Sequence, residues 1–328
     1  MTLSIIIVNW NVKDLLEKCL TSIYKETQNI DFEVIVIDNA SSDNSADMVR
    51  NKFPQVKLIA NKENKWFAGG NNQGIKMAQG DLILLLNPDT VVLDGAVNKM
   101  VGIMGGAAVL GCKLLNPDMT IQPSCRKLPC LSDQILILLK LHNFFPNLKP
   151  IRKYYMSDYK YNDTREVEQV MGACLMTRKK VVEQIGGLDE KYGSIFEEVD
   201  FCRRVGNTPV TYIKEGKHTP DPSNRGELAK IVPLLRGDRG VLNSKIYFTD
   251  KAKIIHHKGQ SFRQRKIITN QKNFNYALLR YFMKYKPLWQ YLIILALWPV
   301  SMLLSIVDQL MLLTGIRKFK EKFKKGEY

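Results

Sequence analysis

Short apolar runs alternate with stretches of helical periodicity in the first third of the chain. Residues 3–8, 33–37, 56–59 and 81–86 are mostly aliphatic, as in strands that are buried on both faces of a sheet. Between the first two runs, apolar residues recur at helical spacing over residues 15–23. This alternation predicts a parallel sheet covered by helices on both faces, and the ligands of such sheets bind at the carboxyl ends of the strands.

The middle of the chain is less regular. A Gly- and Asn-rich loop is predicted at 69–74, with a short helix near 75–78. Residues 206–245 are rich in Lys, Arg, Gly and Pro and are predicted to form a long loop or insertion. Around this insertion we expect a strand at 170–177, a helix at 179–185, a helix that opens at 197–204 and a strand at 252–255.

The C-terminal part of the chain changes character. Residues 288–307 carry no charged side chain and are long enough to cross a bilayer, but Pro299 interrupts the run and Asp308 ends it. Basic residues flank the run on both sides, which favours both ends on the cytoplasmic side of a membrane. We therefore expect a kinked hairpin in the headgroup region; a single span and a buried pair of core helices stay open as alternatives.

Charge and cysteine content narrow the class of protein. The 328 residues carry 48 Lys and Arg against 32 Asp and Glu, and this net charge of +16 favours a polyanionic partner: nucleic acid, anionic lipid or a phosphorylated substrate. Six cysteines without a CxxC pair argue against a structural zinc site and suit a reducing compartment. The chain opens on an expected strand and not on a signal-peptide pattern, so we expect a cytoplasmic catalytic part.

Polar residues follow the first two predicted strands. Asn9 ends the first strand, and Asp38 and Asn39 end the second, before a Ser- and Asn-rich turn that contains Asp43. A carboxylate in this position accepts hydrogen bonds from a ribose in dinucleotide sites. The same residue types form ordinary Asx turns and helix N-caps, so the local pattern leaves both interpretations open.

The segment 64–74 combines glycines with amide side chains. Its glycines permit close approach to the backbone, and its asparagines offer donors to a phosphate or a base. The segment matches neither the GxxxxGK[ST] phosphate loop nor the GxGxxG fingerprint, which disfavours a P-loop ATPase and a nicotinamide enzyme. A plain turn remains the alternative.

The strand at 81–86 ends in Asn87-Pro88-Asp89. A carboxylate at this position can help to hold a divalent ion against a diphosphate leaving group, although an ordinary turn fits the same residues. His256 follows the last predicted strand and either binds a metal or a phosphate or has a structural role.

Three acidic residues, Glu197, Glu198 and Asp200, share one predicted helical turn. Crowded carboxylates raise the pKa of at least one of them, which suits a general base. Acidic residues are also favoured in any first helical turn by the helix dipole, and nearby arginines offer partners. The pattern therefore indicates a base without excluding a structural role.

In their order along the chain, these motifs resemble the family 2 glycosyltransferases, and within them the rhamnosyltransferase-like branch of bacterial cell-surface polysaccharide synthesis. The resemblance covers about residues 1–204 and 246–265. It implies a GT-A fold, which is α/β with a Rossmann-like mixed, mainly parallel sheet flanked by helices. We expect a nucleotide-sugar-binding half at 1–112, an acceptor and catalytic half at 113–265, and C-terminal membrane-associated helices with a basic tail at 266–328.

The resemblance implies transfer of a sugar from a nucleotide diphosphate donor with inversion. Asp38 would contact the base or ribose of the donor. Asp89 would bind Mg²⁺ or Mn²⁺, and His256, from the family's His-x-x-Gly-x-Ser pattern, would help to hold the metal or the diphosphate. Asn87 stands where the family's Asp-x-Asp motif has its first carboxylate. The other donor-binding candidates are Asn9, Asn39, Asp43, Asn64, Gly69, Asn71 and Asn72.

By the same resemblance Glu198 is the catalytic base, at a position where the family usually has Asp, and Glu197 and Asp200 support the acceptor side. The chain lacks the Gln-x-x-Arg-Trp motif of processive synthases, so transfer of a single sugar is favoured. The expected donor is dTDP-rhamnose, followed by UDP-sugars.

The expected acceptor is a polyprenyl-diphosphate-linked or cell-surface glycan. It would be met at the anionic cytoplasmic face of the bacterial inner membrane, where the chain would be peripheral or monotopic. A non-catalytic, membrane-tethered binding protein of the same fold is the alternative. A nucleic-acid partner is not expected, because the basic residues concentrate beside the apolar C-terminal run and form no recognition pattern.

Overall fold

The computed structural model describes residues 1–208, 245–259 and 266–313. The chain forms two compact units, the first with Met1–Leu128 and Tyr159–His257 and the second with Pro129–Asp158 and Lys258–Tyr328. The functional boundaries expected at residues 112 and 265 stay predictions. Most of the predicted insertion at 206–245 and the basic tail after residue 313 lie outside the described residues.

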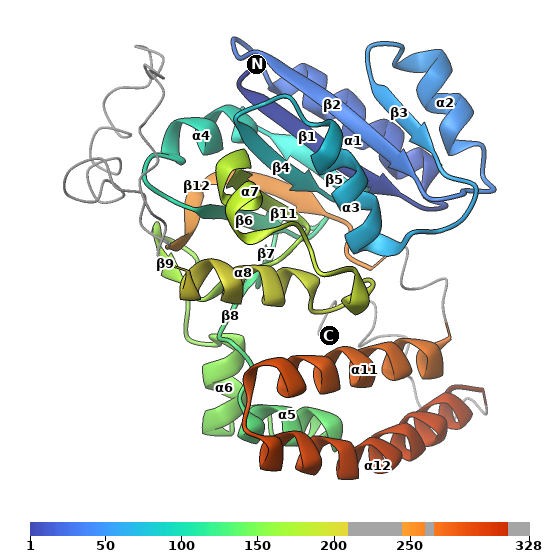
Figure 1. Cartoon of the computed structure of the whole chain (residues 1–328), viewed down its shortest axis with the longest axis vertical. Coiled ribbons are helices and arrows are strands. Elements are labelled where there is room, and N and C mark those ends of the chain that lie inside the picture. Colours follow the sequence, from blue (N-terminus) through green and yellow to red (C-terminus); the bar gives the residue numbers. More distant parts are fainter. Residues whose placement is uncertain (209–244, 260–265, 314–328) are drawn as a thin grey trace. The chain divides into compact units, whose positions relative to one another are not determined.

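The first unit is built around one mixed sheet (Figure 1). Its parallel part has the order β3 (Lys57–Ala60), β2 (Phe32–Asp38), β1 (Leu3–Asn9) and β4 (Leu82–Leu86). The order continues through β11 (Cys174–Arg178), β6 (Val109–Leu115), β12 (Ile246–His256) and β5 (Thr90–Leu93). Strands β11 and β5 run antiparallel to their neighbours in this order, whereas β6 and β12 run parallel to each other.

Short strands extend the sheet at its edges. Strand β7 (Ile121–Gln122) pairs with β6, and β9 (Arg165–Val167) pairs with β12. Strands β8 (Cys125–Arg126) and β10 (Gln169–Val170) form a separate two-stranded ladder. The architecture is therefore the mixed α/β sheet with flanking helices that the sequence predicts.

Helices cover both faces of this sheet. They are α1 (Lys13–Glu26), α2 (Ser45–Lys52), α3 (Trp66–Met77), α4 (Ala96–Ile103), α7 (Lys179–Ile185), α8 (Glu197–Asn207) and the 3-10 turn η2 (Glu190–Tyr192). Successive residues of β1 point to opposite faces. Ile5 and Ile7 join the core that includes Leu16 of α1, while Ile6 and Val8 meet α3. Figure 1 shows α3 in front of the sheet and α1 behind it.

The predicted loop at 69–74 is wrong, because these residues lie inside α3. A Cβ on Gly70 would stand 2.8 Å from Cγ1 of Val8, and one on Gly74 would stand 2.4 Å from Cγ2 of Ile6. The glycines therefore serve close packing of a helix on β1 rather than approach of a ligand. Glycine has low helix propensity, which is why the local pattern indicated a loop.

The strand predicted at 170–177 is two strands. Strand β10 ends at Val170 and β11 begins at Cys174, because the chain passes between them from the small ladder to the main sheet. The helix at 179–185 and the helix start at Glu197 are confirmed, and the last strand is longer than predicted, since β12 begins at Ile246.

The second unit is helical. It contains α5 (Leu131–Leu138), the 3-10 turn η1 (Leu141–Asn143), α6 (Lys149–Tyr155), α11 (Ile267–Tyr285) and α12 (Leu288–Leu313). Helix α12 continues through Pro299, so the hairpin expected within 288–307 is wrong. The hairpin is formed instead by α11 and α12, which pack along each other.

Polar side chains join the helices of this hairpin. Gln271 Nε2 donates to Oδ1 of Asn275 at 2.8 Å and to Oγ of Ser301 at 3.1 Å. The hydroxyl of Ser301 lies 3.2 Å from the same oxygen of Asn275. Lys140, between α5 and η1, forms an ion pair with Asp308 of α12. One side of α12 is therefore fixed by polar contacts within the unit.

Candidate active site

The carboxyl ends of β1 and β2 carry a buried polar network. Asn9 lies opposite Asp38, and its Nδ2 donates to Oδ1 of Asp38 at 2.9 Å and to Oγ of Ser41 at 3.1 Å. The other oxygen of Asp38 accepts from the backbone N–H of Ser41 at 3.0 Å. Oδ1 of Asn9 has no hydrogen-bond partner among the described residues. The network holds a carboxylate and an amide at the edge where ligands of such sheets bind.

Asn39 connects the end of β2 to the start of α3, and Asn64 orders the turn that precedes this helix. Asn39 Nδ2 donates to the carbonyl of Trp66 at 3.0 Å, and Asn39 Oδ1 accepts from Asn61 Nδ2 at 3.0 Å. Asn64 Oδ1 accepts from the backbone N–H of Trp66 at 2.8 Å. Trp66 is held at φ +61° with 45% of its surface exposed. The bonds of Asn39 therefore hold the start of α3 beside the end of β2.

Asp43 holds the starts of two helices. Its Oδ2 accepts from the backbone N–H of Lys13 at 2.8 Å, and its Oδ1 accepts from that of Ser45 at 3.1 Å. The carboxylate thereby satisfies N–H groups at the first turns of α1 and α2. Asp43 thus orders the turn that carries the Asp38 network.

The candidates within α3 make contacts that hold the fold. Asn71 Nδ2 donates to the carbonyl of Phe67 at 2.9 Å. Asn72 exchanges two hydrogen bonds with the backbone of Leu188, at 2.8 and 2.9 Å. A Cβ on Gly69 would stand 3.6 Å from Oε2 of Glu190. These residues fix α3 against the segment that precedes α8.

Asp89 and His256 lie together at the carboxyl end of β4. Because β12 pairs with β5, His256 lies opposite Thr90 and its Nε2 is 3.3 Å from Oδ1 of Asp89. Nδ2 of Asn87 is also 3.3 Å from this ring nitrogen. Asp89 and His256 are almost completely buried. Pairing of distant strands thus brings all three predicted residues into one cluster.

This cluster fits a divalent ion that takes most of its ligands from a substrate. It offers one carboxylate and one imidazole, and no group of three or more His, Cys, Asp or Glu suited to a metal occurs in the part of the chain that the structure describes. Mg²⁺ typically binds through one or two carboxylates, substrate phosphates and water. The donor set therefore suits a metal–diphosphate complex better than a free ion.

The first turn of α8 holds two crowded carboxyls. Burial raises the pKa of Glu197, and the charge of Glu198 raises it further. Burial also raises the pKa of Glu198, while the positive charge of Arg126 acts in the opposite direction. Glu197 is buried and its Oε2 has no hydrogen-bond partner among the described residues, whereas Glu198 is half-buried. Glu198 is therefore the better placed of the two to meet a substrate.

Asp200 has a different environment from the two glutamates. It is fully buried and accepts a hydrogen bond from Nε of Arg204 at 2.7 Å. The guanidinium of Arg204 also donates to the carbonyls of Ile185 and Gly187, both at 2.7 Å. Asp200 and Arg204 thus fix α8 to the end of α7.

A short backbone path joins the Asp89 cluster to α8. The N–H of Asn87 donates to the carbonyl of Ala173 at 3.0 Å. A Cβ on the neighbouring Gly172 would lie 3.5 Å from Cβ of Glu198 and 3.6 Å from the ring of Phe67. Segments 87–89, 171–174 and 197–198 are therefore packed next to one another.

Two residues of the site have no signal in the sequence. Ser41 completes the Asp38 network, and Gln122 contacts His256 with its Oε1 2.7 Å from Nδ1 of the ring. Ser41 lies in a turn rich in similar residues, and Gln122 lies in a strand of two residues. Only the pairing of strands reveals their partners.

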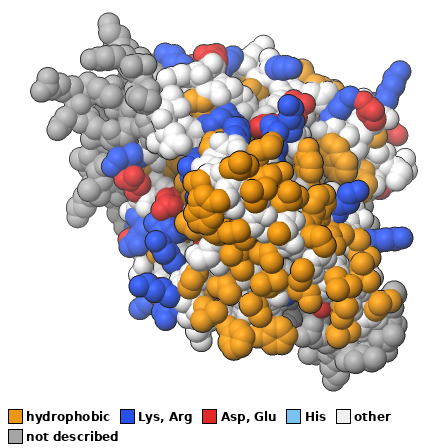
Figure 2. Space-filling view, turned by 60° about the horizontal axis from the view of Figure 1, so that its bottom comes forward, with side chains coloured by type: hydrophobic (Ala, Val, Ile, Leu, Met, Phe, Trp, Pro, Cys, Tyr) orange, Lys and Arg blue, Asp and Glu red, His pale blue; other side chains and the backbone are white. Residues whose placement is uncertain are grey.

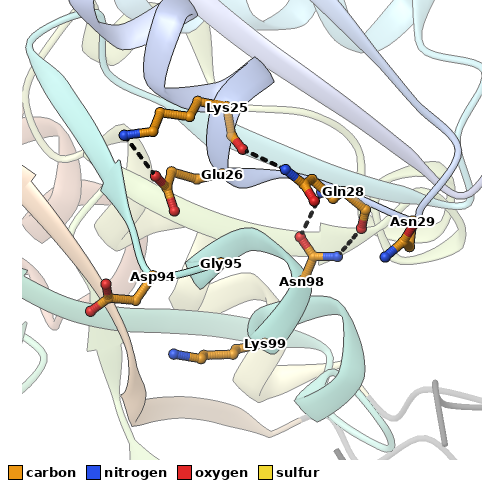
Figure 3. A pocket seen from close by; sticks show the side chains of 8 residues that line it. All are labelled: Lys25, Glu26, Gln28, Asn29, Asp94, Gly95, Asn98 and Lys99. Carbon is orange, nitrogen blue, oxygen red and sulfur yellow. Dashed lines mark hydrogen bonds and ion pairs between the residues drawn. The ribbon is translucent and has the colours of Figure 1, made fainter. Parts of the chain in front are cut away.

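A separate pocket of about 320 Å³ lies between the C-terminal end of α1 and the start of α4 (Figure 3). It is lined by Lys25, Glu26, Gln28, Asn29, Asp94, Gly95, Asn98 and Lys99. Gln28 and Asn98 hydrogen-bond across it, and its charges are mixed. Because α1 returns antiparallel to β1, this pocket lies toward the amino ends of the parallel strands, away from the Asp38 network.

The sequence matches one described protein family and several named glycosyltransferases. The family description "Glycosyl transferase family 2" matches residues 4–186. The chain is 26% identical over 218 residues to N-acetylglucosaminyl-diphospho-decaprenol L-rhamnosyltransferase of Mycobacterium tuberculosis, with 62% of this chain and 70% of that protein covered. It is 27% identical over 210 residues to the low-salt glycan biosynthesis hexosyltransferase Agl10 of Haloferax volcanii, covering 62% and 61%.

Solved structures are similar at lower identity. The mannosyltransferase PcManGT from Pyrobaculum calidifontis, in complex with GDP-Man and Mn²⁺, has a TM-score of 0.48 at 14% identity. This similarity covers 98% of this chain and 83% of that one.

Proposed function

The chain belongs to glycosyl transferase family 2, and we propose that it is an inverting, metal-dependent enzyme that transfers one sugar from a nucleotide diphosphate donor to a lipid-linked or cell-surface glycan. The rhamnosyltransferase named among its relatives supports rhamnose as the first sugar to test, and we propose dTDP-rhamnose as the first donor, followed by UDP-sugars. The same relative carries a polyprenyl diphosphate in its name, which supports an acceptor of that class.

One observation carries this proposal: the cluster of Asp89, His256 and Asn87 lies close to Glu198. A backbone hydrogen bond joins Asn87 to Ala173, and the neighbouring Gly172 packs against Glu198. Transfer from a nucleotide diphosphate needs stabilisation of a leaving diphosphate and removal of a proton from the acceptor hydroxyl. Asp89 and His256 suit the first task and Glu198 suits the second.

Glu198 is proposed as the general base. It would take the proton of the acceptor hydroxyl while that oxygen forms a bond to the anomeric carbon and the bond from this carbon to the diphosphate breaks. Attack from the face opposite the leaving group inverts the anomeric centre. The raised pKa of Glu198 suits this role, because the carboxylate is then a better proton acceptor. Glu197 and Asp200 are proposed to support the acceptor side, Asp200 by fixing α8 through Arg204.

Asp89 and His256 are proposed to hold Mg²⁺ or Mn²⁺ together with the donor. The ion would supply positive charge that neutralises the leaving diphosphate. Asp38 and Asn9 are proposed to contact the base or ribose, with Asn39, Asp43, Asn64, Gly69, Asn71, Asn72 and Asn87 as the other donor-side residues. Among these, Asp43, Gly69, Asn71 and Asn72 would act indirectly, through the turn and the helix α3 that they hold in place.

Donor binding and hydrolysis by the detergent-purified full chain test this function. We expect Mn²⁺- or Mg²⁺-dependent binding that selects one nucleotide among dTDP-, UDP- and GDP-sugars. Asp89→Asn should sharply raise the divalent-ion concentration that half-maximal activity needs, while the exposed Asp47→Asn should not. Binding of none of these donors would favour the non-catalytic, membrane-tethered protein.

The second unit is proposed to bind the anionic cytoplasmic face of the bacterial inner membrane. By length and composition, Leu288–Met311 is long and apolar enough to cross a bilayer, which by itself is weak evidence. Figure 2 shows apolar side chains gathered on one face. The exposed apolar residues of this unit include Phe144, Phe145, Leu288, Trp289, Leu292, Leu303 and Leu310. A patch of this kind is typical of a membrane or protein interface.

An interfacial position suits α12 better than a span. Helix α12 packs along α11, which carries Lys272, Arg280 and Lys284. A spanning α12 would take these charges into the hydrocarbon, where charged side chains are costly. Lying in the headgroup region, α12 would bury its exposed apolar side and leave the charges of α11 in water.

Flotation with lipid vesicles tests the membrane proposal. We expect the full chain to float with anionic vesicles, and the double variant Leu303→Glu and Leu310→Glu to float less, because both side chains are exposed on α12. Met77→Glu replaces an exposed apolar residue of the first unit and should change nothing. Equal flotation of the double variant and the native chain would assign membrane binding to another surface.

A further inference from the structure

The side chain of Gln122 is enclosed by polar groups of the first unit. Its Oε1 lies 2.7 Å from Nδ1 of His256. Its Nε2 donates to the backbone carbonyl of His256 at 3.2 Å and to Oδ1 of Asn116 at 2.8 Å. Gln122 and His256 are 2% and 3% exposed, so bulk water does not compete for these contacts. The direction of each hydrogen bond can therefore be derived from the groups present.

A backbone carbonyl fixes the amide of Gln122. The carbonyl of His256 can only accept, so the group that faces it is the NH₂ of Gln122 and not its oxygen. The amide oxygen of Gln122 then faces the imidazole, and Nδ1 must carry a proton to donate to it.

A second line of contacts gives the same direction. The hydroxyl of Thr120 donates to Oδ1 of Asp118 at 2.5 Å, and hydrogen bonds from Thr120 lower the pKa of Asp118, which keeps this carboxylate an acceptor. Thr120 Oγ1 therefore accepts from Nδ2 of Asn116, at 2.9 Å. Asn116 is left with its oxygen toward Gln122, which must donate to it. Residues of the turn between β6 and β7 thus set the donor and the acceptor of each hydrogen bond in the chain from Asp118 to the imidazole of His256.

We propose that Gln122 is a positioning residue that keeps the proton of the His256 imidazole on Nδ1, so that the Nε2 lone pair is directed at the Asp89 cluster. Nε2 lies 3.3 Å from Oδ1 of Asp89 and 3.3 Å from Nδ2 of Asn87. In the neutral ring this tautomer leaves Nε2 without a proton, so that Nε2 can bind a divalent ion or accept a hydrogen bond from Nδ2 of Asn87. The inference rests on the proposed function, in which Asp89 and His256 hold the metal–diphosphate complex.

The opposite tautomer would leave no lone pair on Nε2 for a ligand. With a proton on Nε2, His256 would donate to the carboxylate of Asp89, and the two side chains would satisfy each other instead of a ligand. Without an acceptor at Nδ1, Asp89 is the charged group that attracts the proton to Nε2. Histidines that bind metals usually donate their other N–H to such a partner, and loss of that partner typically costs about 10- to 100-fold in metal affinity.

The tautomer can be read directly by ¹⁵N NMR on the full chain labelled at its 4 histidines, with the His256 signals assigned by their loss in His256→Asn. We expect the native protein to carry the proton on Nδ1. Gln122→Met should move it to Nε2 and weaken binding of Mn²⁺ in the presence of excess inorganic diphosphate by about 10- to 100-fold. Gln122→Glu keeps an acceptor at Nδ1 and should keep the proton there, but it removes the NH₂ group that donates to the His256 carbonyl and to Asn116, so it tests the proton on Nδ1 and not the metal affinity.

Asp118→Asn is the distal control, because the His256 carbonyl still fixes Gln122, and it should leave the tautomer unchanged. A native spectrum with a proton on Nε2, whether alone or together with one on Nδ1, would overturn the proposal, and so would a folded Gln122→Met protein with native tautomer and Mn²⁺ affinity. The native spectrum decides even if Gln122→Met does not fold. A chain that keeps Nδ1–H but transfers no sugar would refute the proposed function and leave the role of Gln122 intact.

Discussion

The carboxylate at the end of β2 and those in the first turn of α8 have opposite environments. Asp38 accepts from Asn9 and from the backbone of Ser41, so that both of its oxygens have a hydrogen-bond donor. Glu197 and Glu198 are desolvated and crowded, and one oxygen of Glu197 has no partner among the described residues. Satisfied groups suit recognition of a ligand, whereas carboxyls with raised pKa suit proton transfer. This difference supports the proposed division, with donor binding at the ends of β1 and β2 and proton transfer at the first turn of α8.

The largest effect should come from Glu198→Gln. An amide cannot take the acceptor proton, so kcat should fall by about 10²- to 10⁴-fold while donor affinity stays near native. Initial rates and a donor titration measure both quantities. The matched control is Glu183→Gln on the exposed side of α7, which should stay native. Substantial turnover of Glu198→Gln would move the base to another carboxylate, with Asp200 the first to test.

Asp38→Ala should act on binding instead of chemistry. It removes a charged acceptor, and hydrogen bonds to charged groups contribute about 1.5–3 kcal/mol, which is roughly 10- to 150-fold in the Kd of the donor. Calorimetric titration of the nucleotide gives the Kd, and kcat at saturating donor should be nearly native. Asp47→Ala, an exposed change on α2, is the control. A fall in kcat with unchanged donor affinity would contradict the division between the two regions.

Glu197→Gln should stabilise the fold. Because its folded-state pKa is raised, the native state holds a proton that the unfolded state releases above its ordinary pKa, and stability of the native chain falls as pH rises through that window. Glutamine does not titrate, so the variant should gain about 1–3 kcal/mol at pH 8 and little at pH 4. Urea unfolding at both pH values measures the gain. If the variant and the native chain were equally stable at pH 8, burial of Glu197 would not destabilise the native chain.

The smallest expected effect is a shift of the acid limb of activity. The raised pKa of Glu198 predicts that kcat falls on acidification already above the ordinary pKa of a glutamate. Arg126 lowers this pKa, so Arg126→Gln should move the acid limb to higher pH. A pH profile of kcat for the two proteins measures the shift. Movement toward lower pH would exclude Arg126 as the group that acts on the base.

Local patterns revealed part of the candidate site. Asn9, Asp38 and Asp89 were recognisable because parallel strands end at one edge, and their positions follow from the strands themselves. The glycines of α3 led to the wrong prediction of a loop, because they pack the helix against Ile6 and Val8 of β1, which the local sequence does not show. Gln122 could not be found, since its partner His256 is set by the pairing of β7 with β6 and of β6 with β12.

The sequence by itself determined the α/β class, the first four strands, the acidic turn of α8 and the apolar character of residues 288–307, because each depends on periodicity or composition over a few adjacent residues. Only the tertiary structure decided that Asp89 meets His256, that Gln122 directs the ring, and that the buried Glu197 crowds the half-buried Glu198. These contacts depend on long-range strand pairing and burial, which no local pattern encodes.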